Sequence, residues 1–408
     1  MRLQRLAAPT LLCVVLLATE FPFAQNTPPP NPERDHALEL YRQGKMVEAM
    51  PLLEELSADN PKDIAVLESW GVSVLGYAQT LDDVELRKKA RARSYAILMK
   101  AQSLGDNSDL LQTILRSLPS DGSFAAFSQK KDVDAAMQQA EANFARGDFD
   151  KAREGYMRAH LLDPKQYYAA LFMGDSYFKQ HQPVFAGEWF SNAIEIDPNI
   201  ETAHRYWGDT LLGEDKLEEA RKQYIEAVIA DPYNPNSWGG LKNWTTRTKL
   251  HLNWLKLKDG VAVEVKDGKT NVTLDSSLTK DDPAMGGWLI YGITRASWMK
   301  DKFAKQYPSE SGYRHSLLEE TEALHLFITV VKEAAAKQKT DLSGTDIGAL
   351  VAIEQAGLLE PFALLNRADN GIAKDYEGYR TANRDKVRRY LDEFVVPKTP
   401  VAAAPPLS

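Results

Sequence analysis

The chain has 408 residues, of which 44% are hydrophobic and 26% are charged. This length and this balance are typical of a folded protein with two or more packed regions. The formal net charge of −8 argues against a general nucleic-acid-binding surface, because such a surface is basic. After residue 24, no stretch reaches the roughly 18 apolar residues that can cross a membrane. We therefore expect neither a nucleic-acid partner nor a membrane span after the N-terminal segment.

Residues 1–24 have the pattern of a secretory signal peptide. Two arginines near the start and an apolar run that ends at Ala18 precede an expected cleavage point near Gln25. An uncleaved anchor is the competing interpretation. The one cysteine, Cys13, lies in the apolar run, so a cleaved chain contains no disulfide. The pattern predicts a periplasmic or secreted protein, with residues 25–32 as a proline-rich linker.

We expect residues 33–130 to form two repeat-like helical pairs and a bridge. The first pair has apolar residues three and four apart and ends at Pro61. The second pair carries Trp70-Gly71 where its helices meet. Its extra residues, between Thr80 and Arg91, are mostly charged, and we expect them to lengthen the helices or the turn rather than to fill core. Residues 106–130 predict an irregular bridge that contains one small helix.

A period of 34 residues dominates the stretch from 131 to 235. Asp-Pro closes each unit, and small or aromatic residues recur at the same offsets within it. A fixed period of this length is typical of a helix–turn–helix solenoid, in which small residues let neighbouring helices approach. The recurring positions are Pro164, Pro198 and Pro232; Ala152, Ala186 and Ala220; Tyr156, Phe190 and Tyr224; and Ala159, Ala193 and Ala227.

These columns resemble the tetratricopeptide repeat (TPR) family, in which small residues such as Gly174 and Gly208 stand where two helices touch. The resemblance covers three repeats within residues 131–235. It implies stacked helical hairpins whose first helices line a groove, and a groove that holds an extended peptide or a partner helix. The predicted fold class is all-α: a TPR-type helical-hairpin solenoid followed by a helical C-terminal domain with one short β-hairpin.

Beyond residue 235 the repeat stops and other patterns follow. The tryptophan- and leucine-rich residues 236–258 predict a helix that caps the solenoid. Alternating β-branched residues on either side of Asp267-Gly268 predict a β-hairpin. We expect a C-terminal domain over residues 259–396, with one long helix from about Ser311 to Lys337. Residues 397–408 are rich in proline and alanine, and this composition predicts a disordered tail.

The predicted binding site is the inner face of the solenoid. Residues spaced three, four and three apart share one side of the first helix of each repeat, and in the TPR family this side faces the groove. Glu141, Asp175 and Asp209 form an acidic line along it, which favours a basic or amide-rich segment with apolar anchors. The alternative is that these acids belong to ordinary solvated helix surface. The predicted groove residues are Glu141, Phe144, Tyr168, Phe172, Asp175, Phe178, Arg205, Tyr206 and Asp209.

The acidic column departs from the TPR pattern that clamps a C-terminal carboxylate, because that clamp needs Asn and Lys in the groove. We therefore do not predict carboxylate capture.

The sequence contains no convincing catalytic, metal or cofactor site. There is no Walker sequence, no Gly-x-Ser-x-Gly elbow and no cysteine after cleavage. His315, Glu319, Glu322 and His325 are expected on one helical face, where a Glu-x-x-His pair is the kind of unit that binds metal in a helical bundle. The second copy that such centres need is missing, so we interpret these residues as a polar helix face and predict no cofactor.

The function that these patterns favour is an exported, non-catalytic scaffold that holds a protein or peptide partner in its groove. The alternative is an enzyme or metal-binding module in the C-terminal domain that the repeats recruit. A third hypothesis is a sugar-binding surface on the tryptophan-rich region, whose other interpretation is hydrophobic core. The tryptophans concerned are Trp238, Trp244, Trp254, Trp288 and Trp298. The sequence leaves open the partner, the oligomeric state and the fold of the C-terminal domain.

Overall fold

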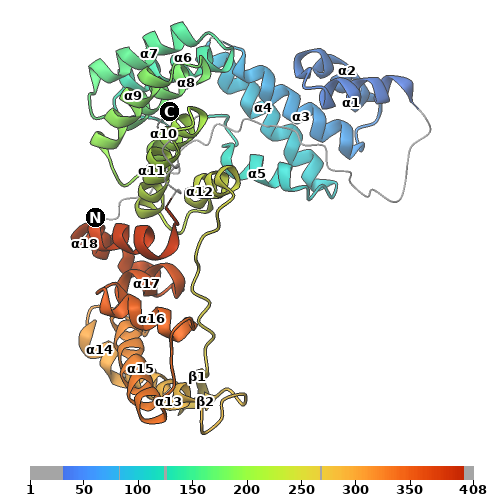
Figure 1. Ribbon diagram of the computed structural model, residues 1–408. Helices are drawn as coiled ribbons and strands as arrows, with labels where there is room; N and C mark the ends of the chain where they lie inside the picture. Colours follow the sequence, from blue (N-terminus) through green and yellow to red (C-terminus); the bar gives the residue numbers. More distant parts are fainter. Residues whose placement is uncertain (1–30, 82, 124–125, 267–268, 399–408) are drawn as a thin grey trace. The chain divides into compact units, whose positions relative to one another are not determined.

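A computed structural model describes residues 31–81, 83–123, 126–266 and 269–398 of the protein. The chain forms two compact units, which divide between Ile196 and Asp197. Within the described ranges the secondary structure is helical apart from one two-stranded sheet (Figure 1). This arrangement confirms the predicted fold class. No helix in the described part of the chain is long and apolar enough to cross a membrane.

The first unit consists of helices that pack in consecutive antiparallel pairs, namely α1 with α2, α3 with α4, α6 with α7, and α8 with α9 (Figure 1). Helix α5 lies in the predicted bridge and packs against α4. The helices are α1 (Pro32–Arg42), α2 (Met46–Asp59), α3 (Ile64–Gln79), α4 (Val84–Ser103), α5 (Asp109–Ser117), α6 (Lys131–Ala145), α7 (Phe149–Leu162), α8 (Tyr167–Lys179) and α9 (Pro183–Ile196).

Local sequence explains where these helices begin and turn. Side-chain oxygens of Asp63 and Asp148 accept hydrogen bonds from backbone N–H groups in the first turns of α3 and α7, which otherwise lack partners. The tight turns between paired helices need a left-handed backbone conformation. Gly44 and Gly147 supply it, with φ of 76° and 79°, in the α1–α2 and α6–α7 turns.

Small residues let the paired helices approach closely, as the repeat predicts. Ala140, Ala152 and Ala159 are fully buried between α6 and α7. In the next pair, a Cβ atom added to Gly174 would lie 2.6 Å from the ring of Phe190. Only glycine therefore lets the α9 ring lie against α8 without a shift.

Helix α4 is longer than the other helices of the first unit. This confirms the prediction that the extra residues between Thr80 and Arg91 lengthen a helix. One of its charges does enter the core, which was not expected. Arg87 is 1% exposed, and its Nη1 donates to the carbonyl oxygen of Gln138 at 3.0 Å. Burial of a guanidinium is sustained by such hydrogen bonds to carbonyl oxygens.

The second unit contains the last repeat, the hairpin and the C-terminal helices. Its elements are α10 (Glu201–Gly213), α11 (Leu217–Ala230), α12 (Pro235–Thr248), β1 (Val261–Lys266), β2 (Lys269–Leu274), α13 (Pro283–Ser297), the π-helical turn η1 (Trp298–Lys302), α14 (Phe303–Gln306), α15 (Leu317–Gln338), α16 (Asp346–Gln355), α17 (Leu359–Asn366), the 3₁₀ turn η2 (Ile372–Asp375), α18 (Tyr376–Tyr390) and the π-helical turn η3 (Leu391–Val395).

The predicted capping helix is shorter than its sequence pattern indicates. Helix α12 ends at Thr248, where Lys249 adopts a left-handed conformation with φ of 58°. The following residues run as an extended segment towards β1 (Figure 1). The backbone N–H of Asn253 donates to the carbonyl oxygen of Val395 at 2.8 Å, so this segment bonds to the C-terminal turn instead of continuing the helix.

The β-hairpin is present over the predicted residues. Strands β1 and β2 are antiparallel, with Val261 opposite Leu274 and Val263 opposite Val272. These alternating apolar residues face α13, where Gly292 leaves room for the Val261 and Val272 side chains. A two-stranded hairpin is marginal alone, and contact with a helix stabilises it.

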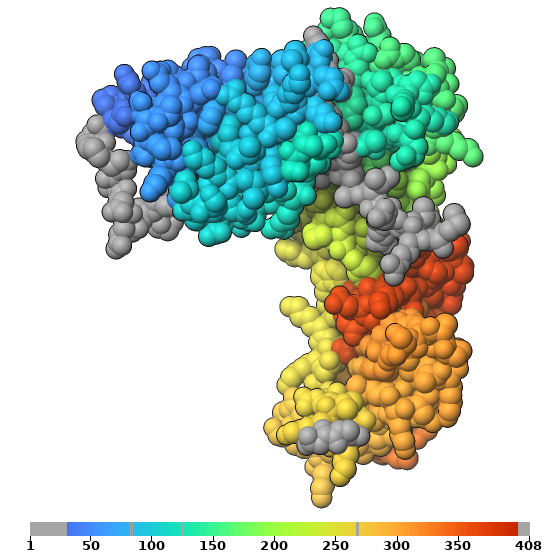
Figure 2. Space-filling view, turned by 180° about the vertical axis from the view of Figure 1, so that it is seen from behind, coloured from blue at the N-terminus to red at the C-terminus, as the bar shows by residue number. Residues whose placement is uncertain are grey.

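The last repeat and the C-terminal helices share one hydrophobic core, which includes Tyr224, Trp244, Phe327 and Phe362. Figure 2 shows the orange α13–α15 region and the red α17–α18 region of this unit as one continuous body. Arg221 of α11 is 1% exposed, and its Nη2 donates to the carbonyl oxygen of Val396 at 2.6 Å. The C-terminal turn is therefore fastened to the last repeat.

Candidate partner-binding face

The predicted groove residues lie on the first helix of each repeat, α6 and α8 in the first unit and α10 in the second. These side chains differ in how many hydrogen bonds, ion pairs and ring contacts they form within the protein. The acidic column in particular is neither a row of free carboxylates nor solvated surface.

Glu141 on α6 is engaged by other residues of the first unit. Its carboxylate accepts a hydrogen bond from the Tyr156 hydroxyl of α7. Burial raises the pKa of Glu141 to about 7, with a further rise from Asp175, whereas the Tyr156 hydrogen bond and the positive charge of Arg87 lower it. Arg87 of α4 also donates to the backbone of α6, so its side chain reaches this part of the predicted face.

Asp209 on α10 repeats the arrangement in the second unit. Its Oδ1 accepts a hydrogen bond of 2.7 Å from the Tyr224 hydroxyl of α11. Burial raises the pKa of Asp209, while Tyr224 and Arg205 oppose the rise. Arg205 is itself paired with Glu201 at 2.9 Å, and its guanidinium lies 4.8 Å from the ring centre of Tyr206.

Asp175 on α8 is different. Among the residues that the structure describes, no hydrogen bond or ion pair reaches its carboxylate, which is partly exposed. Burial raises the pKa of Asp175, and Lys179, one turn further along α8, lowers it through space. Of the three predicted acids, Asp175 is therefore the one left for another molecule.

Two of the predicted aromatic residues are covered by the protein's own bridge. The ring of Phe127 lies 6.1 Å from that of Tyr168 and 6.0 Å from that of Phe172, both edge-on. The Gln166 amide donates to the Phe127 carbonyl oxygen at 2.7 Å, and the Phe127 N–H donates to Asp134 at 2.7 Å. These bonds hold the bridge against the start of α6 and of α8.

The other two predicted aromatic residues of the first unit have opposite environments. Phe144 is 8% exposed and packs edge-on against Phe149 at 5.3 Å, so it belongs to the core. Phe178 is 37% exposed at the end of α8, three residues after Asp175. The accessible part of the face in the first unit is thus centred on the second half of α8.

Sequence reasoning did not identify Phe127 or Arg87, because neither follows the 34-residue period. It did identify the column Tyr156, Phe190 and Tyr224, but only as packing residues. The alternation of Tyr, Phe and Tyr in that column is the signal that distinguishes Asp175 from the other two acids.

The predicted helix from Ser311 to Lys337 is wrong at its start. Helix α15 begins at Leu317, because the Ser316 hydroxyl accepts from the Glu319 N–H and the Leu317 N–H donates to Asp375 at 2.8 Å. His315 therefore lies outside the helix and does not share a helical face with Glu319.

The four candidate ligand residues also turn to separate partners. Glu322 accepts from Trp298 Nε1 at 2.8 Å, and His325 contacts Glu354 at 2.7 Å. Glu319 accepts from Arg295 at 2.8 Å. In the described part of the chain, no group of three or more His, Cys, Asp or Glu side chains is arranged to hold a metal ion.

The tryptophan-rich region is mostly interior. Trp244 is fully buried and donates to the Leu217 carbonyl oxygen at 2.8 Å. Trp288 and Trp298 are also buried. Trp254 is 38% exposed, with its ring 5.0 Å from that of Trp238. The region therefore serves chiefly as core.

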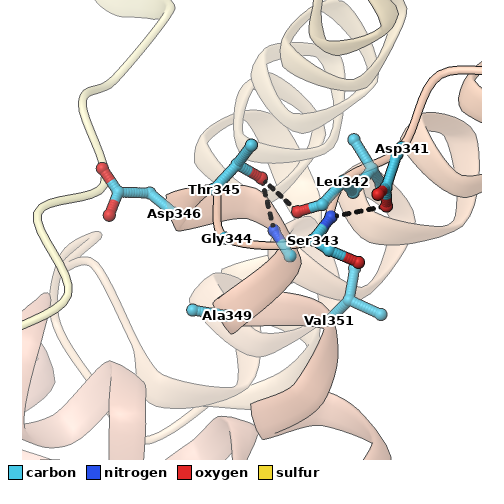
Figure 3. A pocket seen from close by; sticks show the side chains of 9 residues that line it. Asp341, Leu342, Ser343, Gly344, Thr345, Asp346, Ala349 and Val351 are labelled. Carbon is cyan, nitrogen blue, oxygen red and sulfur yellow. Dashed lines mark hydrogen bonds between the residues drawn. The ribbon is translucent and has the colours of Figure 1, made fainter.

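A surface hollow lies at the start of α16, between Asp341 and Val351 (Figure 3). The Thr345 hydroxyl oxygen accepts from the Gly348 N–H at 3.0 Å, and the Ser343 N–H donates to Asp341 at 2.9 Å. These groups cap the helix and close its preceding turn, so the polar atoms that line the hollow are engaged locally.

No family model matches the chain, and a search of curated proteins finds no match in sequence. Among solved structures, the chain is similar to the first TPR of Spaghetti (RPAP3) bound to the HSP90 peptide SRMEEVD, with 19% identity and a TM-score of 0.28 over 30% of this chain and 98% of that chain. It is also similar to MamA, with 16% identity and a TM-score of 0.26 over 48% of this chain and 93% of that chain. Likenesses this low carry no argument about function.

Proposed function

We propose that this protein is a non-catalytic TPR scaffold that holds a segment of a protein partner against the first-helix face of its repeats. The observation that carries this proposal is the second half of α8. Within the described residues no hydrogen bond or ion pair reaches the Asp175 carboxylate, and the partly exposed Phe178 ring stands three residues further along the helix. A charged group beside an accessible aromatic ring is a common form of peptide-binding surface.

Rigidity supports the same function. Helix α8 is fixed by its pairing with α9, by the buried Leu171 and by the bridge bonds at Gln166. A receptor face that is ordered before binding loses little conformational entropy when a partner docks.

Site-specific photo-crosslinking in the native cell tests this function. A photoreactive residue at Phe178 is expected to capture one discrete protein partner. The matched control is the same residue at Leu161, which is 72% exposed on α7, the second helix of its repeat. Equal capture of the same proteins at both positions, or none at Phe178, rejects the proposal.

Export belongs to the proposal as well. Residues 1–24 lie outside the described residues, and their composition is the support for a signal peptide. Cell fractionation of the full chain and of a chain that lacks residues 2–24 tests it. Export predicts that the full chain leaves the cytoplasm and that the truncated chain stays there.

A further inference from the structure

The three repeats carry the same acid–aromatic pair at the same offset. Glu141 and Tyr156, Asp175 and Phe190, and Asp209 and Tyr224 are each 15 residues apart, and each position recurs after 34 residues. In the first and last pairs, the tyrosine hydroxyl donates to the acid. In the middle pair the ring has no hydroxyl.

The absence of this donor follows from the residue type and not from a different packing of the ring. A Cβ added to Gly174 would lie 2.6 Å from the Phe190 ring, and one added to Gly208 would lie 2.5 Å from the Tyr224 ring. Both aromatic rings are also fully buried. The two rings therefore occupy the same place in their helix pairs, and only Tyr224 can reach the acid with a hydroxyl.

The carboxylate of Asp175 favours a cationic group of a partner. Within the described residues, the titratable groups that interact electrostatically with Asp175 are Glu141 of α6, Tyr156 of α7 and Lys179 on α8 itself. Lys179 is exposed and forms no ion pair with Asp175 within the described residues. A carboxylate that is partly buried and accepts no hydrogen bond from the protein has lost some of its bound water. A cationic hydrogen-bond donor would replace that lost hydration.

We infer that Asp175 is the anchor for a lysine or arginine side chain of the partner, with a neighbouring apolar residue of the partner packed on Phe178. This inference rests on the proposed function and adds the chemistry that the face recognises. It also narrows the expected acidic line to one position, because Glu141 and Asp209 already accept from tyrosines.

Peptide pools with one fixed position test the anchor. The probes are fluorescein-labelled heptapeptides whose central residue is Lys, Arg, norleucine or Glu and whose other positions mix Ala, Leu and Phe. Binding to the full chain is measured by anisotropy at low salt. We expect the Lys or Arg pool to bind roughly tenfold or more tightly than the norleucine pool, as a charge-assisted hydrogen bond provides.

Two variants assign this preference to Asp175. Asp175→Asn removes the charge, whereas Phe190→Tyr keeps the charge and supplies the hydroxyl that the other repeats have. Both should reduce the preference for Lys or Arg by roughly tenfold. Glu188→Gln, an exposed acid on the same helix as Phe190, is the matched control and should leave it unchanged. Circular dichroism verifies that each variant is folded.

The outcomes separate the inference from the function on which it rests. If the pools bind without a preference for Lys or Arg, or if both variants keep the preference, the anchor is refuted while the scaffold function stands. If no pool binds and the crosslinker at Phe178 captures nothing, both are refuted.

Discussion

Arg367, the residue directly after α17, donates from its Nε to the Oε1 of Glu320 on α15 across 2.8 Å, and Glu320 is fully buried. The other oxygen of Glu320 accepts from the Tyr291 hydroxyl at 2.6 Å and contacts His315 at 3.0 Å. One carboxylate therefore ties α13, α15, α17 and the segment before α15 together. This interior network lies in the C-terminal helices of the second unit.

Replacing Arg367 by Met is expected to destabilise the second unit by about 3–5 kcal/mol, because the change leaves a buried carboxylate without its cation. Urea unfolding followed by tryptophan fluorescence measures the loss. The control is Arg389→Met, whose partner Glu393 forms an ion pair that is about half exposed on both sides. That pair should contribute about 0–1 kcal/mol. Equal losses in the two variants would contradict the buried role of Glu320.

The same network predicts how stability depends on acid. Burial alone would raise the pKa of Glu320, but the hydrogen bond from His315 and the charge of Arg367 overcome it and lower the pKa to about 2. A carboxyl with a lowered pKa in the folded state stabilises the fold above its unfolded pKa of about 4.5. This contribution, roughly 3 kcal/mol, is lost as the pH falls from about 4.5 towards 2.

Urea unfolding at a series of pH values checks this dependence. Glu320→Gln should be less stable than the natural chain at pH 6, and the difference should shrink as the pH approaches 3. A constant difference between the two chains over that range would refute a lowered pKa at Glu320.

Helix contacts in the last repeat give a prediction that depends on space alone. Gly208→Ala should cost about 1–3 kcal/mol, because the added Cβ would lie 2.5 Å from the fully buried Tyr224 ring. Gly213→Ala on the same helix meets no atom within 4 Å and should stabilise the protein by about 0.4–1 kcal/mol. Thermal unfolding of both variants measures the opposite signs. Two shifts of the same sign would contradict the close approach at Gly208.

The repeat could be predicted from sequence because its signals are local and periodic. The 34-residue spacing of Ala152, Ala186 and Ala220 marks where helices touch, and all three residues are fully buried. The alternating residues on either side of Asp267-Gly268 similarly predicted a β-hairpin, which the antiparallel pairing of Val263 with Val272 confirms. In both cases the residues that decide the structure are close in the chain or recur regularly.

The predictions of helix ends and of burial were wrong where a contact with a residue far away in the sequence overrides the local helical pattern. An apolar pattern continues past Thr248, but Asn253 bonds to Val395, which is far away in the sequence. The sequence around His315 predicts a helix. However, the Leu317 N–H donates to Asp375, and this hydrogen bond helps to start the helix after His315. The burial of Arg87 likewise depends on the carbonyl oxygen of Gln138, in another helix pair. A single sequence does not display such partners.

The sequence predicted where the three acids lie in their helix pairs, but not which of them is already hydrogen-bonded within the protein. The period correctly placed Glu141, Asp175 and Asp209 at one place in three helix pairs. An acid at this place accepts a hydrogen bond only where the opposite helix carries a tyrosine hydroxyl. The 34-residue period does not distinguish tyrosine from phenylalanine at that position. The accessible part of the face in the first unit reduces to the end of α8 because Phe127 covers Tyr168 and Phe172.

Glu141 predicts a pH dependence of the opposite sign to that of Glu320. Burial raises its folded pKa to about 7, above the ordinary value of 4.5, so the folded state holds a proton that the unfolded state releases. The first unit should therefore lose stability as the pH rises from about 4.5 to 7. Glu141→Gln replaces the carboxyl by a neutral amide of similar shape, which does not ionise, and should remove this loss of stability. The variant should therefore be more stable than the natural chain at pH 8 but not at pH 5. Chemical unfolding at the two pH values measures the difference, and Glu188→Gln on the exposed side of α9 serves as the control. A variant that gains equally at both pH values would show that Glu141 does not titrate in this range.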